Sequence, residues 1–81
     1  MARVVLPRNL QAMTAGEAEV ILDAPDVRRL FVKLGERYPR LRDHLEHELA
    51  VAIDGEIFQD AWLAPIRPDS EVVLVPKIAG G

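Results

Sequence analysis

Hydrophobic and polar positions along the chain predict five strands. Residues 3–6, 49–53 and 71–76 are nearly continuous apolar runs, as in strands that are largely buried. Residues 17–23 alternate between apolar and polar positions, which is typical of a half-buried strand. Residues 56–58 form a short return strand, because the dipeptide before them favours a hairpin turn.

A helical pattern separates the second and third of these strands. Five apolar side chains recur at helical spacing and form one stripe: Val27, Leu30, Phe31, Leu34 and Tyr38. We expect Pro25 to occupy the first helical position, Asp26 to complement the helix dipole, and Pro39 to end the helix. A shorter helical segment is expected at residues 40–48, with Leu41 and Leu45 on one face.

Turn-forming residues predict how the remaining elements connect. Asp54 and Gly55 form a two-residue hairpin signal, because a type I′ turn requires positive φ at both positions. Residues 59–70 read as a loop that crosses the molecule, shaped by Pro65, Pro68 and Asp69. Three apolar residues of this loop are expected to tuck against the core: Trp62, Leu63 and Ile66.

The order strand, strand, helix, strand, short strand, strand predicts an α+β fold. One main helix must cover one face of a mixed four- to five-stranded sheet. A right-handed crossover then places the first and last strands side by side in the centre of the sheet. This is the β-grasp, or ubiquitin-like, arrangement. We expect residues 1–76 to form the β-grasp domain and residues 77–81 to form a flexible C-terminal Gly-Gly tail.

The amino-acid composition excludes several classes of protein and of functional site. With 81 residues and 49% apolar residues, the chain is one small domain with a packed core. It has no cysteine, so disulfides, thiol nucleophiles and cysteine metal sites are excluded. A net charge of −3 argues against nucleic-acid binding. No apolar run approaches membrane-spanning length, and the first residues do not resemble a signal peptide, so a cytoplasmic protein without a membrane partner is expected.

Charge is distributed unevenly along the chain. Residues 28–42 contain six basic side chains and one acidic side chain, whereas residues 43–60 contain six acidic side chains and no lysine or arginine. This pattern indicates either two solvated faces or an electrostatic field that steers a partner onto the domain.

The sheet is expected to have an apolar outer face. The first and last strands are apolar at successive positions, yet only one helix is available to cover one face. Four residues are therefore candidates for partner binding on the other face: Val5, Ile21, Val73 and Val75. The alternative is that the loop around Trp62 covers part of that face.

The chain ends on Gly80 and Gly81 directly after a predicted core strand. Glycine has no Cβ, so a Gly-Gly tail is thin and can enter a narrow site on another protein. Residues 77–81, if extended, reach about 16 Å beyond the fold. The terminus therefore suits presentation of one chemical group, the α-carboxylate of Gly81.

These residues resemble a known family. The ending from Val75 to Gly81 is similar to the terminus of the MoaD/ThiS sulfur-carrier proteins, which have a ubiquitin-like fold. Residues 53–56 and 68–72 resemble the family's central hairpin and its entry into the last strand. The resemblance implies that a ubiquitin-activating-type enzyme consumes ATP to adenylate Gly81. A sulfur donor then converts the terminus to a thiocarboxylate, which delivers sulfur to a synthase subunit.

The same resemblance assigns roles to the residues before Gly81. Gly80 and Ala79 allow close backbone approach, and Ile78 anchors the tail. Pro76 and Lys77 are further candidates for partner binding, the alternative for Lys77 being a solvated side chain. The domain then needs no bound cofactor and no catalytic side chain, and acts as a carrier protein or small subunit.

The sequence does not decide which biosynthetic pathway receives the sulfur. Pro76-Lys77 departs from the two consecutive prolines common in molybdopterin carriers, whereas residues 7–16 resemble carriers that feed cysteine synthesis. Molybdopterin and cysteine roles rank together, ahead of thiamine synthesis and protein conjugation.

Three other functions compete with the carrier role. A ubiquitin-like interaction module would bind partners through the sheet face without chemistry at its terminus. A metal site at His44 and His47 lacks the third and fourth ligands that zinc requires. An acid–base enzyme would use three carboxylates that are better explained by turn and strand positions: Asp54, Glu56 and Asp60.

Overall fold

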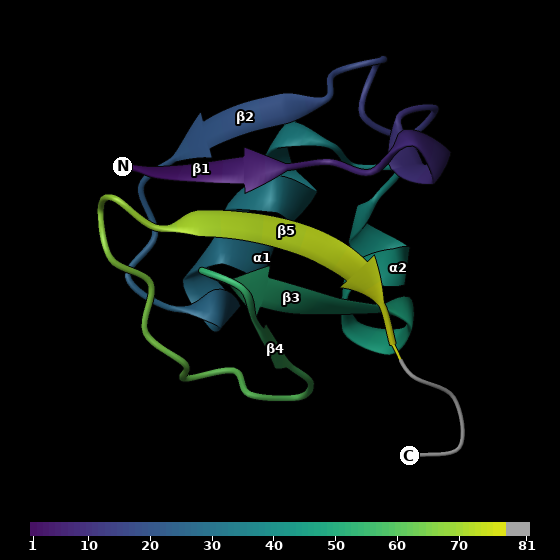
Figure 1. Cartoon of the computed structure of the whole chain (residues 1–81). Coiled ribbons are helices and arrows are strands. Elements are labelled where there is room, and N and C mark those ends of the chain that lie inside the picture. The colour runs from purple at the N-terminus through teal and green to yellow at the C-terminus, as the bar shows by residue number, and fades with distance from the viewer. Residues whose placement is uncertain (78–81) are drawn as a thin grey trace.

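The computed structural model describes residues 1–77, except for the side chain of Glu46. Five strands form one sheet in front of two helices (Figure 1). The strands are β1 Ala2–Val5, β2 Glu19–Leu22, β3 Leu49–Ile53, β4 Glu56–Phe58 and β5 Glu71–Pro76. The helices are α1 Val27–Arg37 and α2 Arg42–Glu48, with a 3₁₀ turn at Arg8–Leu10. The predicted α+β fold with one main helix on a mixed sheet is confirmed.

The sheet has the strand order β2-β1-β5-β3-β4. β1 and β5 run parallel, and the other neighbouring strands are antiparallel. The first and last strands are therefore adjacent, as the sequence predicts, and β5 is the central strand. In the parallel pair, Val5 lies beside Val73, and the same β5 residue lies opposite Ala52 of β3.

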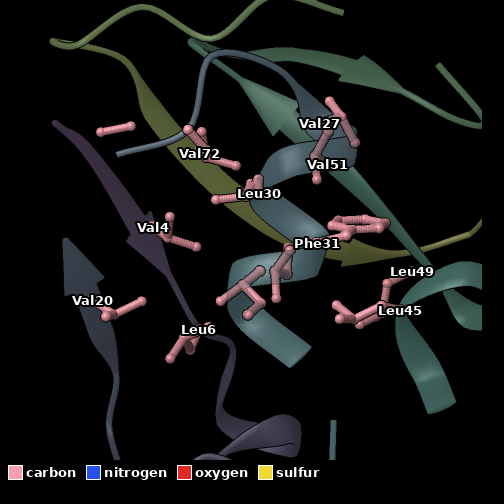
Figure 2. Packing of buried hydrophobic residues seen from close by; sticks show 14 of the residues in the cluster. Val4, Leu6, Val20, Val27, Leu30, Phe31, Leu45, Leu49, Val51 and Val72 are labelled. Atoms are coloured by element: carbon pink, nitrogen blue, oxygen red, sulfur yellow. The ribbon is translucent and has the colours of Figure 1, made fainter. Parts of the chain in front are cut away.

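The core lies between the sheet and α1 (Figure 2). Alternate strand residues such as Val4 and Val72 point toward the helix and are fully buried. The predicted stripe on α1 faces them, and both Leu30 and Leu34 are fully buried. Burying a side chain of this size contributes about 1.5–3 kcal/mol, so this layer supplies most of the stability of the domain.

The start of α1 differs from the prediction. Asp26, not a residue inside the helix, is the N-cap, and its Oδ1 accepts the backbone N–H of Arg29 at 2.8 Å. Pro25 lies before the helix, because its carbonyl oxygen accepts the N–H of Ile66 at 2.9 Å. This contact holds the chain extended up to the cap. The end of the helix at Arg37, just before Tyr38 and Pro39, is as predicted.

The loop between β4 and β5 follows the start of α1. Ile66 is buried, and Trp62 packs edge-on against Phe31 with ring centroids 5.4 Å apart. The prediction for Leu63 is wrong, because its side chain is 78% exposed. The carbonyl oxygens of its neighbours Trp62 and Ala64 accept N–H groups from the first turn of α1, which turns Leu63 outward. Since Trp62 lies on the helix side, this part of the loop does not cover the outer face of the sheet.

Two smaller predictions also have clear outcomes. Asp54 and Gly55 both have positive φ, at 49° and 90°, so the hairpin turn has the backbone conformation that the sequence predicts. The strand predicted at residues 17–23 is shorter, because only Glu19–Leu22 pairs with β1. Ala18 lies outside it and is exposed.

Candidate functional site

The last described residues of the chain are held by two polar contacts. β5 ends at the exposed Pro76, and the backbone N–H of Lys77 then donates to the carbonyl oxygen of Glu48 at 3.0 Å. The Lys77 Nζ donates to Asp60 Oδ1 at 2.8 Å. These contacts fix the point where the chain leaves the sheet. The remaining predicted site residues, Ile78, Ala79, Gly80 and Gly81, lie outside the described residues.

The outer face of the sheet carries a continuous apolar surface. The strand register aligns Val5, Val73, Ala52 and Ile57 in one row across β1, β5, β3 and β4. Val75 extends the row toward the end of β5, whereas its partner Ala50 is only 2% exposed. We call the five accessible residues of this face the apolar strip: Val5, Ala52, Ile57, Val73 and Val75. The strip ends one residue before Pro76 and Lys77.

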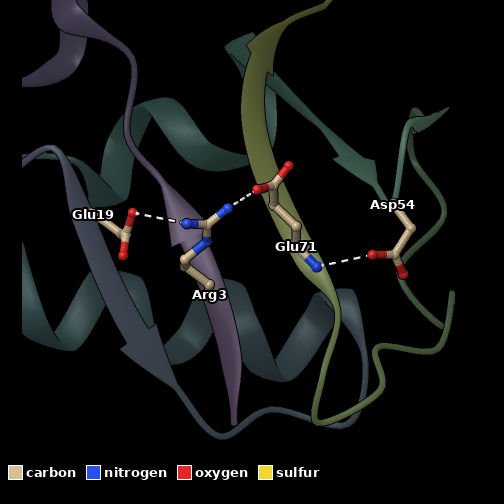
Figure 3. A network of polar contacts seen from close by, with 4 residues as sticks. All are labelled: Arg3, Glu19, Asp54 and Glu71. Atoms are coloured by element: carbon tan, nitrogen blue, oxygen red, sulfur yellow. Dashed lines mark hydrogen bonds and ion pairs between the residues drawn. The ribbon is translucent and has the colours of Figure 1, made fainter.

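Ion pairs border the apolar strip on one side (Figure 3). Arg3 lies between Glu71 and Glu19, bonding the first carboxylate directly and approaching the second at 3.6 Å. Ile21 lies opposite Arg3 and is 49% exposed, so it flanks the strip and is not part of its row. All three charged side chains are about half exposed, so they stabilise the fold little but set a charged boundary.

A further carboxylate at this boundary has a structural role. Asp54 Oδ1 accepts the backbone N–H of Glu71 at 2.9 Å, which ties the β3–β4 turn to the start of β5. This hydrogen bond, together with one from the Ser70 side chain, lowers the pKa of Asp54 below its usual value of 3.8.

A comparison with protein-family models covers nearly the whole chain, including its C-terminal residues. The family model described as the ThiS family matches residues 4–81. The chain belongs to the ThiS family. The match extends beyond β5 through Gly81, so it includes both the sheet with its apolar strip and the Gly-Gly ending.

Solved structures support the same fold for this ThiS-family chain. A chain from the Amycolatopsis orientalis BexX/CysO complex is 20% identical, with a TM-score of 0.83 over 100% of both chains. Mycobacterium tuberculosis CysO is 16% identical, with a TM-score of 0.81 over 96% of this chain and 100% of that one. The small archaeal modifier protein 1 of Methanosarcina acetivorans is 20% identical, with a TM-score of 0.78 over 99% and 95%. No curated protein matches the chain.

The sequence did not single out Ile57 or Ala52 as part of this surface. β3 is apolar at every position, so its sequence alone does not tell which residues face outward. The available signal was the Asp54-Gly55 turn, because it sets Ile57 opposite Ala52. The exposed side chain of Ile57, at 55%, then marks the far end of the strip.

The residues of the alternative metal and acid–base sites have other roles in this ThiS-family domain. His44 Nδ1 contacts Glu48 one helical turn away, and the side chains that the structure describes form no group of three potential metal ligands. The three carboxylates considered for acid–base chemistry each have a different environment. Asp54 supports the turn, Asp60 contacts Lys77, and Glu56 is exposed on β4. Within the described residues, neither helix has the length and apolar character needed to cross a membrane.

Proposed function

We propose that this ThiS-family chain is a sulfur carrier that works through the carboxylate of Gly81. The observation that carries the proposal is the continuity of the apolar strip with the anchored Lys77, four residues before that carboxylate. A partner that docks on the strip meets the chain where it leaves β5. The terminal residues then need to span only about 13 Å to enter the partner's reactive site.

The proposed chemistry begins with activation, because a carboxylate is anionic and a poor electrophile. A Gly81 carboxylate oxygen attacks the α-phosphorus of ATP on the activating enzyme, and pyrophosphate leaves. A sulfide-level sulfur nucleophile then attacks the carbonyl carbon, a C–S bond forms, and AMP leaves. The product is a thiocarboxylate, whose sulfur attacks an electrophilic acceptor on a synthase subunit and forms a new bond to it. Water then cleaves the acyl C–S bond, which leaves the sulfur on the acceptor and restores the Gly81 carboxylate. The carrier's own side chains are not required to move a proton in these steps.

The two proposed partners use the same surface of the carrier, one after the other. The activating enzyme and the sulfur-accepting synthase both need Gly81, so they bind one after the other. Val5, Val73 and Val75 supply apolar contact area for each of them, and Ile21 lies at the margin. Molybdopterin and cysteine synthesis remain the first-ranked destinations of the sulfur.

The absence of cysteine provides a direct test. The full chain is incubated with ATP, its cognate activating enzyme and a sulfur source, and is then treated with a thiol-selective alkylating reagent. Fragment mass spectrometry should find an ATP-dependent label on the C-terminal fragment, since no side-chain thiol exists. A variant lacking Gly81 should take up no label and should keep its melting temperature, because every described core contact lies before residue 78.

An unlabelled terminus, with an activating enzyme proven on its own carrier, would contradict the carrier role. The apolar strip would then support the second function, a ubiquitin-like module that binds partners through its sheet. That module should retain binding after both terminal glycines are removed, whereas a carrier should lose all activity.

A further inference from the structure

A second surface feature lies on the helix side of the domain, away from the apolar strip. Residues of α1 and α2, together with Trp62 and Leu63 of the loop after β4, line an open groove with a volume of about 1040 Å³. Phe31 and Leu45 form part of its lining, and Trp62 stands beside them. The two helices that line the groove lie on one side of the sheet, opposite its outer face (Figure 1). The groove and the apolar strip can therefore be occupied together.

Exposed apolar side chains form the walls of this groove. Val32 on α1 is 54% exposed, and Leu63 on the loop is 78% exposed. Leu63 is held in this position, because the carbonyl oxygens of Trp62 and Ala64 accept N–H groups of α1 at 2.9 and 3.2 Å. Two large apolar side chains fixed at the mouth of an open groove suit contact with another chain.

The charges around the groove are mainly basic. Arg28 lines the groove, and its guanidinium forms no hydrogen bond or ion pair with the side chains that the structure describes. Arg42 also lines the groove, and its Nη2 donates to the carbonyl oxygen of Gly35 at 3.1 Å. Gly35 permits this contact, because a Cβ there would lie 3.2 Å from the Arg42 Nε. Among the described side chains that line the groove, Glu36 is the one acidic residue.

We propose that this groove is a docking site for an acidic, amphipathic segment of a partner protein. The apolar residues of the segment pack between Val32 and Leu63, and an adjacent Asp or Glu pairs with Arg28. A peptide segment fits better than a small molecule, since Val32 and Leu63 are more than half exposed and the groove does not enclose its occupant. The inference goes beyond the proposed function, because it requires no chemistry at Gly81.

The occupant is chosen by charge complementarity. Arg28 offers an unpaired cation beside apolar surface, and the other arginine of the groove still has donors that its contact with Gly35 does not use. A basic segment would meet two arginines and one glutamate, which is unfavourable on balance. A phosphate backbone would meet a protein of net charge −3 and an apolar groove wall.

A random-peptide display selection on the full-length chain tests the proposal. Trp62 is the only tryptophan and lines the groove, so selected peptides without tryptophan can be titrated by its fluorescence. We expect enriched peptides to share an apolar residue next to Asp or Glu, and to change the Trp62 emission.

Two variants and a matched control decide where these peptides bind. Arg28→Glu should weaken binding about fivefold, the equivalent of about 1 kcal/mol, because it removes one exposed charge pair and places a like charge beside the acidic residue of the peptide. Leu63→Ser should also weaken it, and both substitutions fall on exposed positions that leave the core intact. Arg29→Glu makes the same charge change at the next exposed position of α1, outside the groove, and should leave the affinity unchanged.

Three results would overturn the proposal. They are a selection that enriches no peptide, a selection whose peptides lack acidic residues, and acidic peptides whose affinity falls equally in the Arg28 and Arg29 variants. None of these results depends on ATP or on Gly81, so the proposed docking site and the proposed carrier chemistry succeed or fail separately.

Discussion

The Nζ of Lys77 lies 2.8 Å from Oδ1 of Asp60. The lysine side chain is 22% exposed and the aspartate 66% exposed, so the pair lies at the surface where β5 ends. A second contact, from the Lys77 N–H to Glu48, fixes the backbone at the same place. The direction in which the chain leaves the sheet is therefore set by two elements distant in sequence, the end of α2 and the loop after β4.

Asp60→Asn is expected to slow activation while leaving the fold intact. Asparagine keeps the size of the side chain and tolerates the positive φ of 54° at this position, but it removes the charge that pairs with Lys77. An exposed pair contributes about 0.2–1 kcal/mol, so kcat/KM of the activating enzyme should fall by at most about fivefold. Asp69→Asn removes the same charge from an exposed position of the same loop and serves as the control. Equal rates for the two variants would show that the Lys77 contact does not position the terminus.

Ile57→Thr is expected to weaken the complex with the activating enzyme. Threonine keeps the β-branched shape that suits β4 but places a hydroxyl at the end of the apolar strip. The affinity should fall by about fivefold, roughly 1 kcal/mol, with little change in melting temperature. Val32→Thr makes a comparable change at a similarly exposed position on α1. If the two variants weaken the complex alike, the outer sheet face is not the docking surface.

Leu34→Ala should be strongly destabilising. The side chain is fully buried between α1 and the sheet, so its truncation leaves a cavity in the core. A loss of about 2–5 kcal/mol in the free energy of unfolding is expected by urea titration. Truncation of the exposed Val32 to alanine provides the comparison and should change stability little. A neutral Leu34 variant would mean that the helix presents a different face to the sheet.

Asp54→Asn should change how stability depends on pH. The pKa of Asp54 is below 3.8 in the folded protein, because the Glu71 N–H and the Ser70 side chain stabilise its ionised form. Its stabilising effect is therefore present above that value and is lost as the pH falls through the lowered folded pKa. The melting temperature of the wild type should exceed that of the variant at neutral pH, and the difference should shrink in strong acid. A difference that stays constant with pH would mean that the Asp54 charge does not contribute.

Local sequence signals account for most of the fold. The bounds of β3, β4 and β5 agree with the prediction. β3 and β5 are marked by apolar runs, and the start of β4 is marked by the Asp-Gly turn, so each signal lies within a few residues of the element that it predicts. The start of α1 was less predictable. Asp26 rather than Pro25 became the boundary because residues 64–66, distant in sequence, bond to this part of the chain.

The candidate surfaces depended more on long-range pairing. Val5, Val73 and Val75 could be identified from continuous apolar strands, but Ile57 required the register between β3 and β4. The groove could not be predicted, because it exists only where the path of the loop brings Leu63 beside α1. The same path explains why the prediction that Leu63 is buried was wrong.

The central position of β5 makes folding depend on a late segment of the chain. Without residues 71–76, the sheet separates into two antiparallel pairs, β1 with β2 and β3 with β4. Two-stranded units of this kind are at best marginally stable in water. During synthesis, the first 70 residues are therefore expected to remain open to proteases and chaperones until β5 joins Arg3 to Glu71, 68 positions away. Once β5 has joined the sheet, the domain is folded and the strand that precedes the terminal residues is in place.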